Sequence, residues 1–382
     1  MKILLLAGEE SGVLYAERLA AKIRAATRES VEIRGYQSEG FKTSDLAVMG
    51  FGPVLMKIFY FLGVAKTMKR LITTWRPDVV VTIDYPGLNL KLAAYAKAHG
   101  IPAIHLVCPQ VWAWHQNRIP KVAAALTKLL CFFPFEPALF KGTGLTATFI
   151  GHPMVDVFVA EGGSARAVQT GGAPLLALLP GSRLGEIRRI LPRLLASVKV
   201  LRADPALAGL RVVLPAANEV AAAEIARLVA AAEMPAHTVE IQRGGARDLL
   251  RRADCAAVAS GTATLEAALA GCPTVLVYAV SPFLAAFARW VIKGIAHIGL
   301  ANIIAVKSGL PPPMPELLQE AFTPESVAEL LRRWLTDAGA RTEATAALAR
   351  TTALLQSDGD ALGNAAHEIL AVVDETSRMR GK

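Results

Sequence analysis

The feature that most constrains the fold is an alternation, along almost the whole chain, of short apolar runs with longer helical patterns. Strands of a parallel sheet read as continuous apolar runs because helices cover both faces of the sheet. The runs of the first half are Lys2–Ala7, Val31–Gly35, Val79–Ile83, Ala103–Val107, Leu129–Phe133 and Ala147–Ile150. Those of the second half are Leu175–Leu179, Arg211–Pro215, Thr238–Ile241, Cys255–Ala259 and Thr274–Tyr278.

A stretch of small residues separates the two series of strands. It contains Glu161-Gly162-Gly163-Ser164 and a later pair of glycines, a composition typical of a linker. We therefore predict two doubly wound, Rossmann-like α/β domains that face a cleft. Residues 1–160 would form the first domain, 161–322 the second, and 323–382 a helical tail. The length of 382 residues fits two domains of ordinary size.

The composition is unusually apolar, with 53% hydrophobic and 19% charged residues against about 25% charged in an ordinary domain. Such a chain can bury a large core, which excludes intrinsic disorder. The apolar run before Glu9 is too short for a signal peptide. The longest uncharged segment, 267–288, contains Gly271, Pro273 and Pro282, so a strand followed by a new helix explains it better than a membrane span. The apolar excess instead suggests a membrane surface.

The net charge of +9 points to an anionic partner. No nucleic-acid-binding motif is present, so we expect anionic lipid or a phosphorylated substrate. Between Asp45 and Asp78 there is no acidic residue, and the basic residues of this segment stand among apolar ones. Segments of this kind bind anionic membranes; the alternative is a buried helix with a cationic edge. The candidate membrane residues are Lys57, Phe59, Phe61, Lys66, Lys69 and Arg70.

In the second expected domain, a strand-to-helix turn has the residues that hold phosphate. It reads Pro180-Gly181-Ser182-Arg183 and follows the run that ends at Leu179. Glycine lets a ligand approach the backbone, a helix N-terminus offers free amides, and the arginine fork matches phosphate oxygens. The alternative is a capped turn with a solvated arginine.

A second turn of the same kind, Ser260-Gly261-Thr262, follows the run that ends at residue 259. A capping box with Glu266 would need Ser or Thr at position 263, which is Ala263, so Glu266 lacks its simplest structural role. We expect its carboxylate to accept hydrogen bonds from ribose hydroxyls, with a solvated glutamate as the alternative. Because sheets of this class bind ligands at the carboxyl ends of their strands, the two turns together suit a nucleoside diphosphate.

The first expected domain offers candidates for acceptor chemistry. Asp84 ends the run Val79–Ile83, where its carboxylate would take a proton from an attacking hydroxyl; the alternative is an N-cap for the next helix. Glu9 and Ser11 follow the first run and would face sugar hydroxyls, unless the acidic residue only complements a helix dipole. His152 would line the cleft or serve as a structural histidine.

No metal site is expected. The four cysteines are scattered, which indicates a reducing compartment and no disulfide framework. The only Asp-x-Asp motif, Asp358-Gly359-Asp360, lies in the polar tail, where a turn between helices explains it. No histidine or cysteine cluster has ligand spacing.

Motifs over nearly the whole chain resemble the lipid-A-disaccharide synthase family. They are Leu46-Ala47-Val48-Met49-Gly50, Ile83-Asp84, Pro109-Gln110-Val111-Trp112-Ala113-Trp114 with Arg118, Phe133-Pro134-Phe135-Glu136, Gly151-His152-Pro153, Leu179 to Arg183, Ala259 to Glu266, Pro282-Phe283 and Leu300-Ala301-Asn302. The Val-Trp-Ala-Trp run and the two turns of the second domain are the most specific of these.

The resemblance implies an inverting glycosyltransferase of the two-Rossmann (GT-B) type that needs no cofactor. It would transfer 2,3-diacylglucosamine from UDP-2,3-diacylglucosamine to 2,3-diacylglucosamine 1-phosphate, forming a β-1,6 disaccharide of lipid A biosynthesis, as a peripheral protein at the inner face of the cytoplasmic membrane. A homo-oligomer is left open. By resemblance, Asp84 matches the base, and Arg183 stabilises the diphosphate. The nucleotide side comprises Gly181, Ser182, Ser260, Gly261, Thr262 and Glu266, and the cleft also includes Trp112 and Asn302.

Four departures from the family pattern lie in the first expected domain. They are Val13 for a usual Asp, Pro53 for a Glu, Gly87 for an Asp, and Gly35-Tyr36-Gln37-Ser38 for Gly-Pro-Arg-Met. They leave two further readings: a UDP-sugar glycosyltransferase or epimerase with a different acceptor, and a noncatalytic UDP-sugar-binding protein at the membrane surface.

Overall fold

The computed structural model describes residues 1–8, 10–41, 54–113, 116–163, 172–235, 238–280 and 296–380. For residues 10, 11, 54–59 and 380 it describes the backbone alone. The predictions for Glu9 and for the side chains of Ser11, Lys57 and Phe59 therefore lie outside the described residues.

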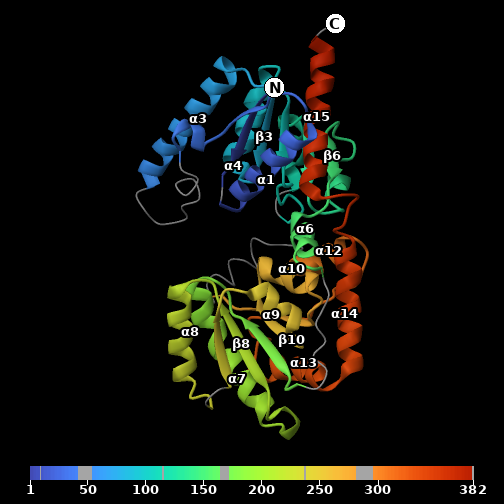
Figure 1. Cartoon of the computed structure of the whole chain (residues 1–382). Coiled ribbons are helices and arrows are strands. Elements are labelled where there is room, and N and C mark those ends of the chain that lie inside the picture. Colours follow the sequence, from blue (N-terminus) through green and yellow to red (C-terminus); the bar gives the residue numbers. More distant parts are fainter. Residues whose placement is uncertain are drawn as a thin grey trace. The chain divides into compact units, whose positions relative to one another are not determined.

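The chain forms two compact units. The first is Met1–Pro153 with Leu355–Lys382, and the second is Met154–Leu354. Each unit contains one six-stranded parallel sheet with helices on both of its faces (Figure 1). The two doubly wound, Rossmann-like α/β domains predicted from the alternation of apolar runs are confirmed.

The sheet of the first unit has the order β2-β1-β3-β4-β5-β6. Its strands are β1 (Lys2–Ala7), β2 (Glu32–Arg34), β3 (Val79–Ile83), β4 (Ala103–Leu106), β5 (Lys128–Cys131) and β6 (Thr146–Phe149). Ala7 of β1 pairs with Ile83 of β3, and Ile83 pairs with Leu106 of β4. These three strands therefore end together, and the loops after them share one edge.

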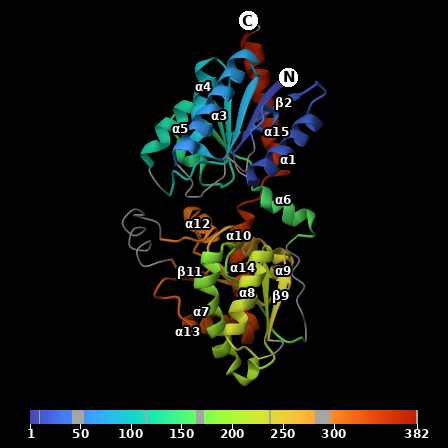
Figure 2. The ribbon, with the colours of Figure 1, turned by 90° about the vertical axis from the view of Figure 1, so that its left-hand side faces the viewer.

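Alternate residues of β1 face opposite sides of this sheet, as the two-residue period of a strand requires. On one side, Ile3 and Leu5 pack among residues of α1 (Glu10–Ala26) and α15 (Ala361–Arg380). On the other side, Leu4 and Leu6 pack among residues of α3 (Val54–Thr74), α4 (Pro86–Ala98) and α5 (Ile119–Ala125). Figure 2 shows the two groups of helices on opposite sides of the strands.

The sheet of the second unit has the order β12-β11-β10-β7-β8-β9. Its strands are β7 (Leu175–Leu179), β8 (Arg211–Ala216), β9 (Val239–Arg243), β10 (Cys255–Ala259), β11 (Thr274–Tyr278) and β12 (Glu316–Leu318). The helices are α7 (Leu184–Arg202), α8 (Glu219–Ala231), α9 (Ala246–Arg252), α10 (Thr262–Leu269), α12 (Leu300–Lys307), α13 (Pro324–Thr336) and α14 (Ala338–Ala353). Helices α7, α8 and α13 contribute to the main apolar core of the unit. Helix α10 packs against α9, α12 and α14.

The units divide the chain differently from the expected boundaries at residues 160 and 322. The expected tail is shared: α13 and α14 belong to the second unit, whereas α15 packs against α1 in the first. Ala365 and Ile369 of α15 are fully buried in the same core as Leu19 and Ile23 of α1. Lys22 also pairs with Asp360 at 2.9 Å. Hydrophobic periodicity predicted a helix here but carries no information about which sheet the helix covers.

Helix α6 (Pro153–Ala160) begins where the chain passes from the first unit to the second. Among the residues that the structure describes, no helix is both long enough and apolar enough to cross a bilayer.

Candidate active site

The two candidate turns of the second unit lie next to each other. Strand β7 pairs with β10, and Leu179 near the end of β7 is the partner of Val258 near the end of β10. The chain then enters α7 through Pro180–Arg183 and α10 through Ser260 and Gly261. Two helix N-termini therefore open side by side at the carboxyl edge of this sheet, as the sequence predicted.

The first turn contains a glycine in close contact with Glu186 and an exposed arginine. Gly181 has φ +104°, and a Cβ at this position would lie 2.5 Å from Oε2 of Glu186, so a side chain does not fit here without displacement. Arg183 is the N-cap residue of α7, and its side chain is 79% exposed. Its Nη1 lies 3.4 Å from Oε1 of Glu186 in the first turn of the helix. This single exposed ion pair leaves most of the guanidinium available to an anion.

The second turn is held by its own hydroxyl groups. Gly261 is the N-cap residue of α10, and at φ +152° and ψ −165° it has a backbone conformation that side chains rarely adopt. The hydroxyl of Thr264 donates to the carbonyl of Gly261 at 2.8 Å, and Oγ of Ser260 lies 3.4 Å from the carbonyl of Ile298. Thr262 is exposed at the start of the helix. No side chain caps α10, so its first amides remain open to a ligand.

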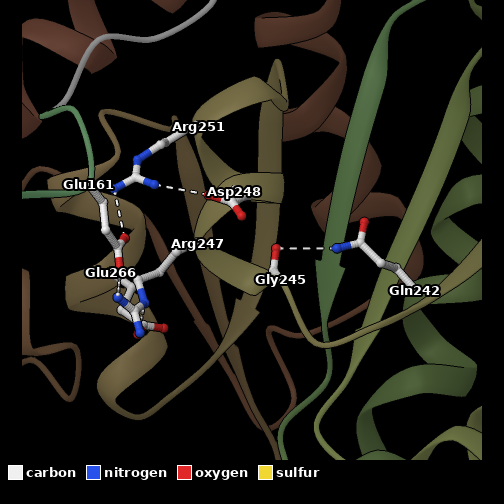
Figure 3. Close-up of polar contacts among 7 residues, drawn as sticks. All are labelled: Glu161, Gln242, Gly245, Arg247, Asp248, Arg251 and Glu266. Atoms are coloured by element: carbon white, nitrogen blue, oxygen red, sulfur yellow. Dashed lines mark hydrogen bonds and ion pairs between the residues drawn. The ribbon is translucent and has the colours of Figure 1, made fainter. Parts of the chain in front are cut away.

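Glu266 does not point freely into solvent but takes part in a charged network (Figure 3). Nε of Arg247 on α9 lies 3.5 Å from its carboxylate. Arg247 also pairs with Glu161 at 2.5 Å, and Glu161 pairs with Arg251 at 3.0 Å. Burial raises the pKa of Glu266, Arg247 opposes this effect, and Glu161 adds to it. The solvated-glutamate alternative therefore does not describe Glu266, which is positioned and electrostatically tuned by Arg247.

Asp84 lies at the corresponding edge of the first unit, directly after β3. Its backbone N–H donates to the carbonyl of Leu106, and its Oδ1 accepts the N–H of Tyr85 at 2.8 Å. Both Asp84 and Tyr85 have φ +49°, an unusual conformation for side-chain-bearing residues. Tyr85 rather than Asp84 is the N-cap residue of α4, and no side chain bonds the helix there. The N-cap alternative for Asp84 is therefore excluded, and strain of this kind is common at functional positions.

Two residues that the sequence reasoning did not select hold this strained turn. Asn89 is fully buried, and its amide donates to the carbonyls of Leu6, Ile83 and Asp84 at 3.3, 3.1 and 2.8 Å. The hydroxyl of Tyr36 donates to Oδ1 of Asn89 at 2.5 Å. Asn89 thus ties the ends of β1 and β3 to the backbone of Asp84. An asparagine in an otherwise apolar stretch of helix was the available signal.

Of the remaining candidates of the first unit, His152 and Trp112 are buried. The His152 ring stacks on Phe133 with 5.6 Å between ring centroids, and burial lowers its pKa to about 4. Trp112 is 8% exposed, and its indole N–H donates to Oε1 of Glu136 at 3.1 Å. Both residues therefore shape the loops at this edge of the sheet and present little surface of their own.

The fold also gathers three potential ligand residues that sequence spacing did not connect. Ligand-type atoms of Cys108, Cys131 and Glu136 lie within 4.8 Å of one another, and all three residues are buried. A hydrogen bond to Cys131 and burial raise the pKa of the Cys108 thiol. Burial raises the pKa of Glu136 to about 8, although its oxygens accept the N–H groups of Trp112 and Phe133. The Glu136 carboxyl joins this cluster to the Trp112 indole and to the backbone of Phe133.

Asn302 is also buried, in the second unit. Its amide donates to the carbonyl of Met314 at 2.8 Å and to Glu316 at 2.7 Å, and its Oδ1 accepts the N–H of Met314 at 3.0 Å. Glu316 further accepts the backbone N–H groups of Ile298 and Gly299. These bonds engage every polar atom of the Asn302 side chain, which fixes the loop before α12.

The predicted membrane residues of α3 divide between two faces of the helix. Lys66, Lys69 and Arg70 are exposed, and Leu62 on the same helix is 60% exposed. Phe61 instead points inward, where it stacks with Tyr85 at 6.2 Å between ring centroids, so it does not belong to the exposed face. The opposite face, which includes Met68 and Ile72, is buried in the core.

The departures from the family pattern fall at separate places in the first unit. Val13 and the segment 35–38 line one cavity of about 340 Å³ between α1 and the end of β2, together with Glu17, Arg24 and Arg34. Gly87 is exposed in the first turn of α4. Pro53 lies outside the described residues.

Two Rossmann-like units, each built on a six-stranded parallel sheet, define the GT-B fold class. A model of the family described as lipid-A-disaccharide synthetase matches residues 3–368. The chain therefore belongs to the lipid-A-disaccharide synthase family and is a glycosyltransferase. The different-acceptor, epimerase and noncatalytic readings are not favoured.

Individual relatives agree with this assignment. The lipid-A-disaccharide synthase of Syntrophus aciditrophicus is 36% identical over 341 residues, covering 85% of this chain and 86% of the relative. That of Anaeromyxobacter dehalogenans is 36% identical over 387 residues, covering 97% of each chain. Among solved structures, CalG4, the calicheamicin glycosyltransferase, is similar in fold, with a TM-score of 0.57, 16% identity and 98% coverage of each chain.

Proposed function

We propose that this chain transfers 2,3-diacylglucosamine from UDP-2,3-diacylglucosamine to 2,3-diacylglucosamine 1-phosphate, forming a β-1,6-linked disaccharide and UDP. The observation that carries the proposal is the pair of adjacent N-termini, of α7 and α10, at the carboxyl edge of the second sheet. A nucleoside diphosphate needs separate anchors for its phosphates and its ribose. The Arg183 turn suits the phosphates, and the α10 turn with Glu266 suits the ribose.

The proposed chemistry divides between the two units. In the first, the Asp84 carboxylate takes the proton of the acceptor 6-hydroxyl as its oxygen attacks the anomeric carbon of the donor. In the second, the bond from the anomeric carbon to the UDP oxygen breaks with inversion. Arg183 and the amides at the start of α7 and α10 stabilise the negative charge that develops on the diphosphate.

We further propose that the protein works as a peripheral protein at the inner face of the cytoplasmic membrane. Support comes from the exposed face of α3, where Leu62 accompanies Lys66, Lys69 and Arg70. An apolar residue flanked by cations suits the interface of an anionic bilayer. Such a position would give the protein access to substrates that carry acyl chains.

The test is UDP release by detergent-purified protein given UDP-2,3-diacylglucosamine, with and without 2,3-diacylglucosamine 1-phosphate. Release that depends on the monophosphate, with a disaccharide of matching mass, is the expected result. UDP binding without release would contradict the proposed reaction. Release without the monophosphate would indicate hydrolysis or a different acceptor.

A further inference from the structure

A groove runs between α4 and α5 of the first unit, on the side of the sheet that these helices cover. Its volume is about 300 Å³. Leu90 and Ala94 of α4 and Val122, Ala124 and Ala125 of α5 form its apolar lining. Small side chains keep the two helices from filling the space between them.

The groove opens beside Asp84. Pro86 and Gly87 line its beginning, and they form the first turn of α4 immediately after Asp84 and Tyr85. A Cβ at Gly87 would meet no atom within 4 Å, so this end of the groove is open. From Pro86 to Ala94 the helix rises about 12 Å, which gives the groove the length of an extended acyl segment.

Three cations border this apolar surface. They are Lys91 on α4, Arg118 at the N-cap position of α5, and Lys121 on α5, and all three are exposed. Within the described part of the chain, no carboxylate forms an ion pair with any of them, and none lines the groove.

An apolar groove with cations along its rim matches one kind of ligand, an amphiphile with a phosphate group. Arginine and lysine bind phosphate oxygens through charge-assisted hydrogen bonds, while the apolar lining of the groove removes acyl methylene groups from water. Pro86 and Gly87 at one end of the groove follow closely after Asp84 in the chain, so a ligand in the groove has this end near the predicted base.

We propose that the α4–α5 groove binds the phosphorylated acceptor, with one acyl chain along Leu90, Ala94 and Val122 and the phosphate held by Lys91, Arg118 and Lys121. This assignment rests on the proposed function, because it is the acceptor of that reaction that carries both groups. It names a binding site in the first unit that is distinct from the nucleotide turns of the second.

Two kinds of variant test the two halves of the site. Lys91→Gln combined with Lys121→Gln removes charge, and Ala94→Trp fills the channel. Each is expected to raise the KM for 2,3-diacylglucosamine 1-phosphate at least tenfold in detergent, with an unchanged UDP affinity. Lys141→Gln is the matched control, since Lys141 is exposed in the same unit and outside the groove, and its KM is expected to stay at the wild-type value.

A binding measurement separates this proposal from the proposed function. Titration calorimetry of the UDP-loaded protein with 2,3-diacylglucosamine 1-phosphate is expected to give binding that both variants weaken, whether or not the sugar is transferred. If transfer occurs but KM and binding are unchanged in the variants, the groove assignment is wrong. It is also overturned if the variants lose only their binding to phosphatidylglycerol vesicles, which would make the groove a contact for bulk lipid.

Discussion

The hydroxyl of Tyr36 donates a 2.5 Å hydrogen bond to Asn89, and Asn89 in turn donates to the backbone carbonyl of Asp84. Tyr36 belongs to the segment 35–38 that departs from the usual family sequence. This departure therefore acts on the turn that carries the predicted base through a single buried side chain.

Tyr36→Phe is expected to lower kcat severalfold and leave the UDP affinity unchanged, because Oδ1 of Asn89 loses its donor and the Asp84 turn loosens. Loss of one buried partner should also lower the free energy of unfolding by about 1–3 kcal/mol. Steady-state kinetics and urea unfolding measure the two effects. Tyr95→Phe, at a partly buried tyrosine in the second half of α4, is the control; an equal loss of kcat there would remove the special role of Tyr36.

Asp84→Asn is expected to lower kcat by about 10²–10⁴-fold, the usual contribution of a positioned general base, while UDP still binds. The side-chain amide oxygen of the Asn variant can still accept the N–H of Tyr85, so the turn should keep its conformation. Single-turnover kinetics and UDP calorimetry separate the two effects. An Asn variant with wild-type turnover would rule out Asp84 as the base.

Arg247→Met is expected to weaken UDP binding. In a plot of UDP affinity against pH, the acidic limb is expected to move to higher pH. Arg247 is the cation that opposes the raised pKa of Glu266, so its loss should raise that pKa further. UDP affinity measured between pH 5 and 8 tests this. The matched control is Arg243→Met, which breaks an exposed ion pair between Arg243 on β9 and Glu219 on α8. Equal profiles for the two variants would assign Glu266 no role in nucleotide binding.

Glu136→Gln is expected to make stability less dependent on pH. Burial raises the pKa of Glu136 to about 8 in the folded protein, against an ordinary value of 4.5. Between these values the folded protein holds a proton that the unfolded chain releases, so the free energy of unfolding falls as pH rises, by about 1.4 kcal/mol per unit. Denaturant unfolding at pH 5, 6.5 and 8 should show the wild type losing stability relative to the Gln variant. Parallel curves would mean that Glu136 is ionised throughout.

Lys66→Gln combined with Arg70→Gln is expected to weaken binding to phosphatidylglycerol vesicles about tenfold or more, because each cation near an anionic surface contributes about 1 kcal/mol. Activity in detergent should persist. Arg189→Gln with Lys199→Gln, two exposed cations of α7, forms the matched control. If both double variants lose the same affinity, binding reflects net charge and not α3.

The buried strands could be predicted from the sequence almost residue by residue. The bounds of β3, β7, β10 and β11 are those of the apolar runs, because a strand covered on both faces has no polar position to blur its ends. Strand β12 was missed, since three residues at a sheet edge carry too little pattern. The phosphate turns were found for a local reason: a glycine and a cation follow a strand directly.

The partners of these local motifs could not be predicted, because they come from distant parts of the chain. Arg247 reaches Glu266 from α9, and Tyr36 reaches Asn89 from the loop after β2. No local pattern marks such pairs. Trp112 and Asn302 were recognised as motif residues, yet only the fold reveals that both are buried and hydrogen-bonded within their own units.

Helix α15 has a consequence for how the protein is made. The last helix of the described chain completes the core around α1 and the first sheet, with Ala365 and Ile369 fully buried there. A ribosome synthesises the whole of the second unit before α15 emerges. The second unit can therefore fold as soon as it has emerged, whereas the first waits with an open apolar face until α15 has followed. A nascent chain is accordingly expected to need a chaperone for residues 1–153 in the interval before α15 emerges.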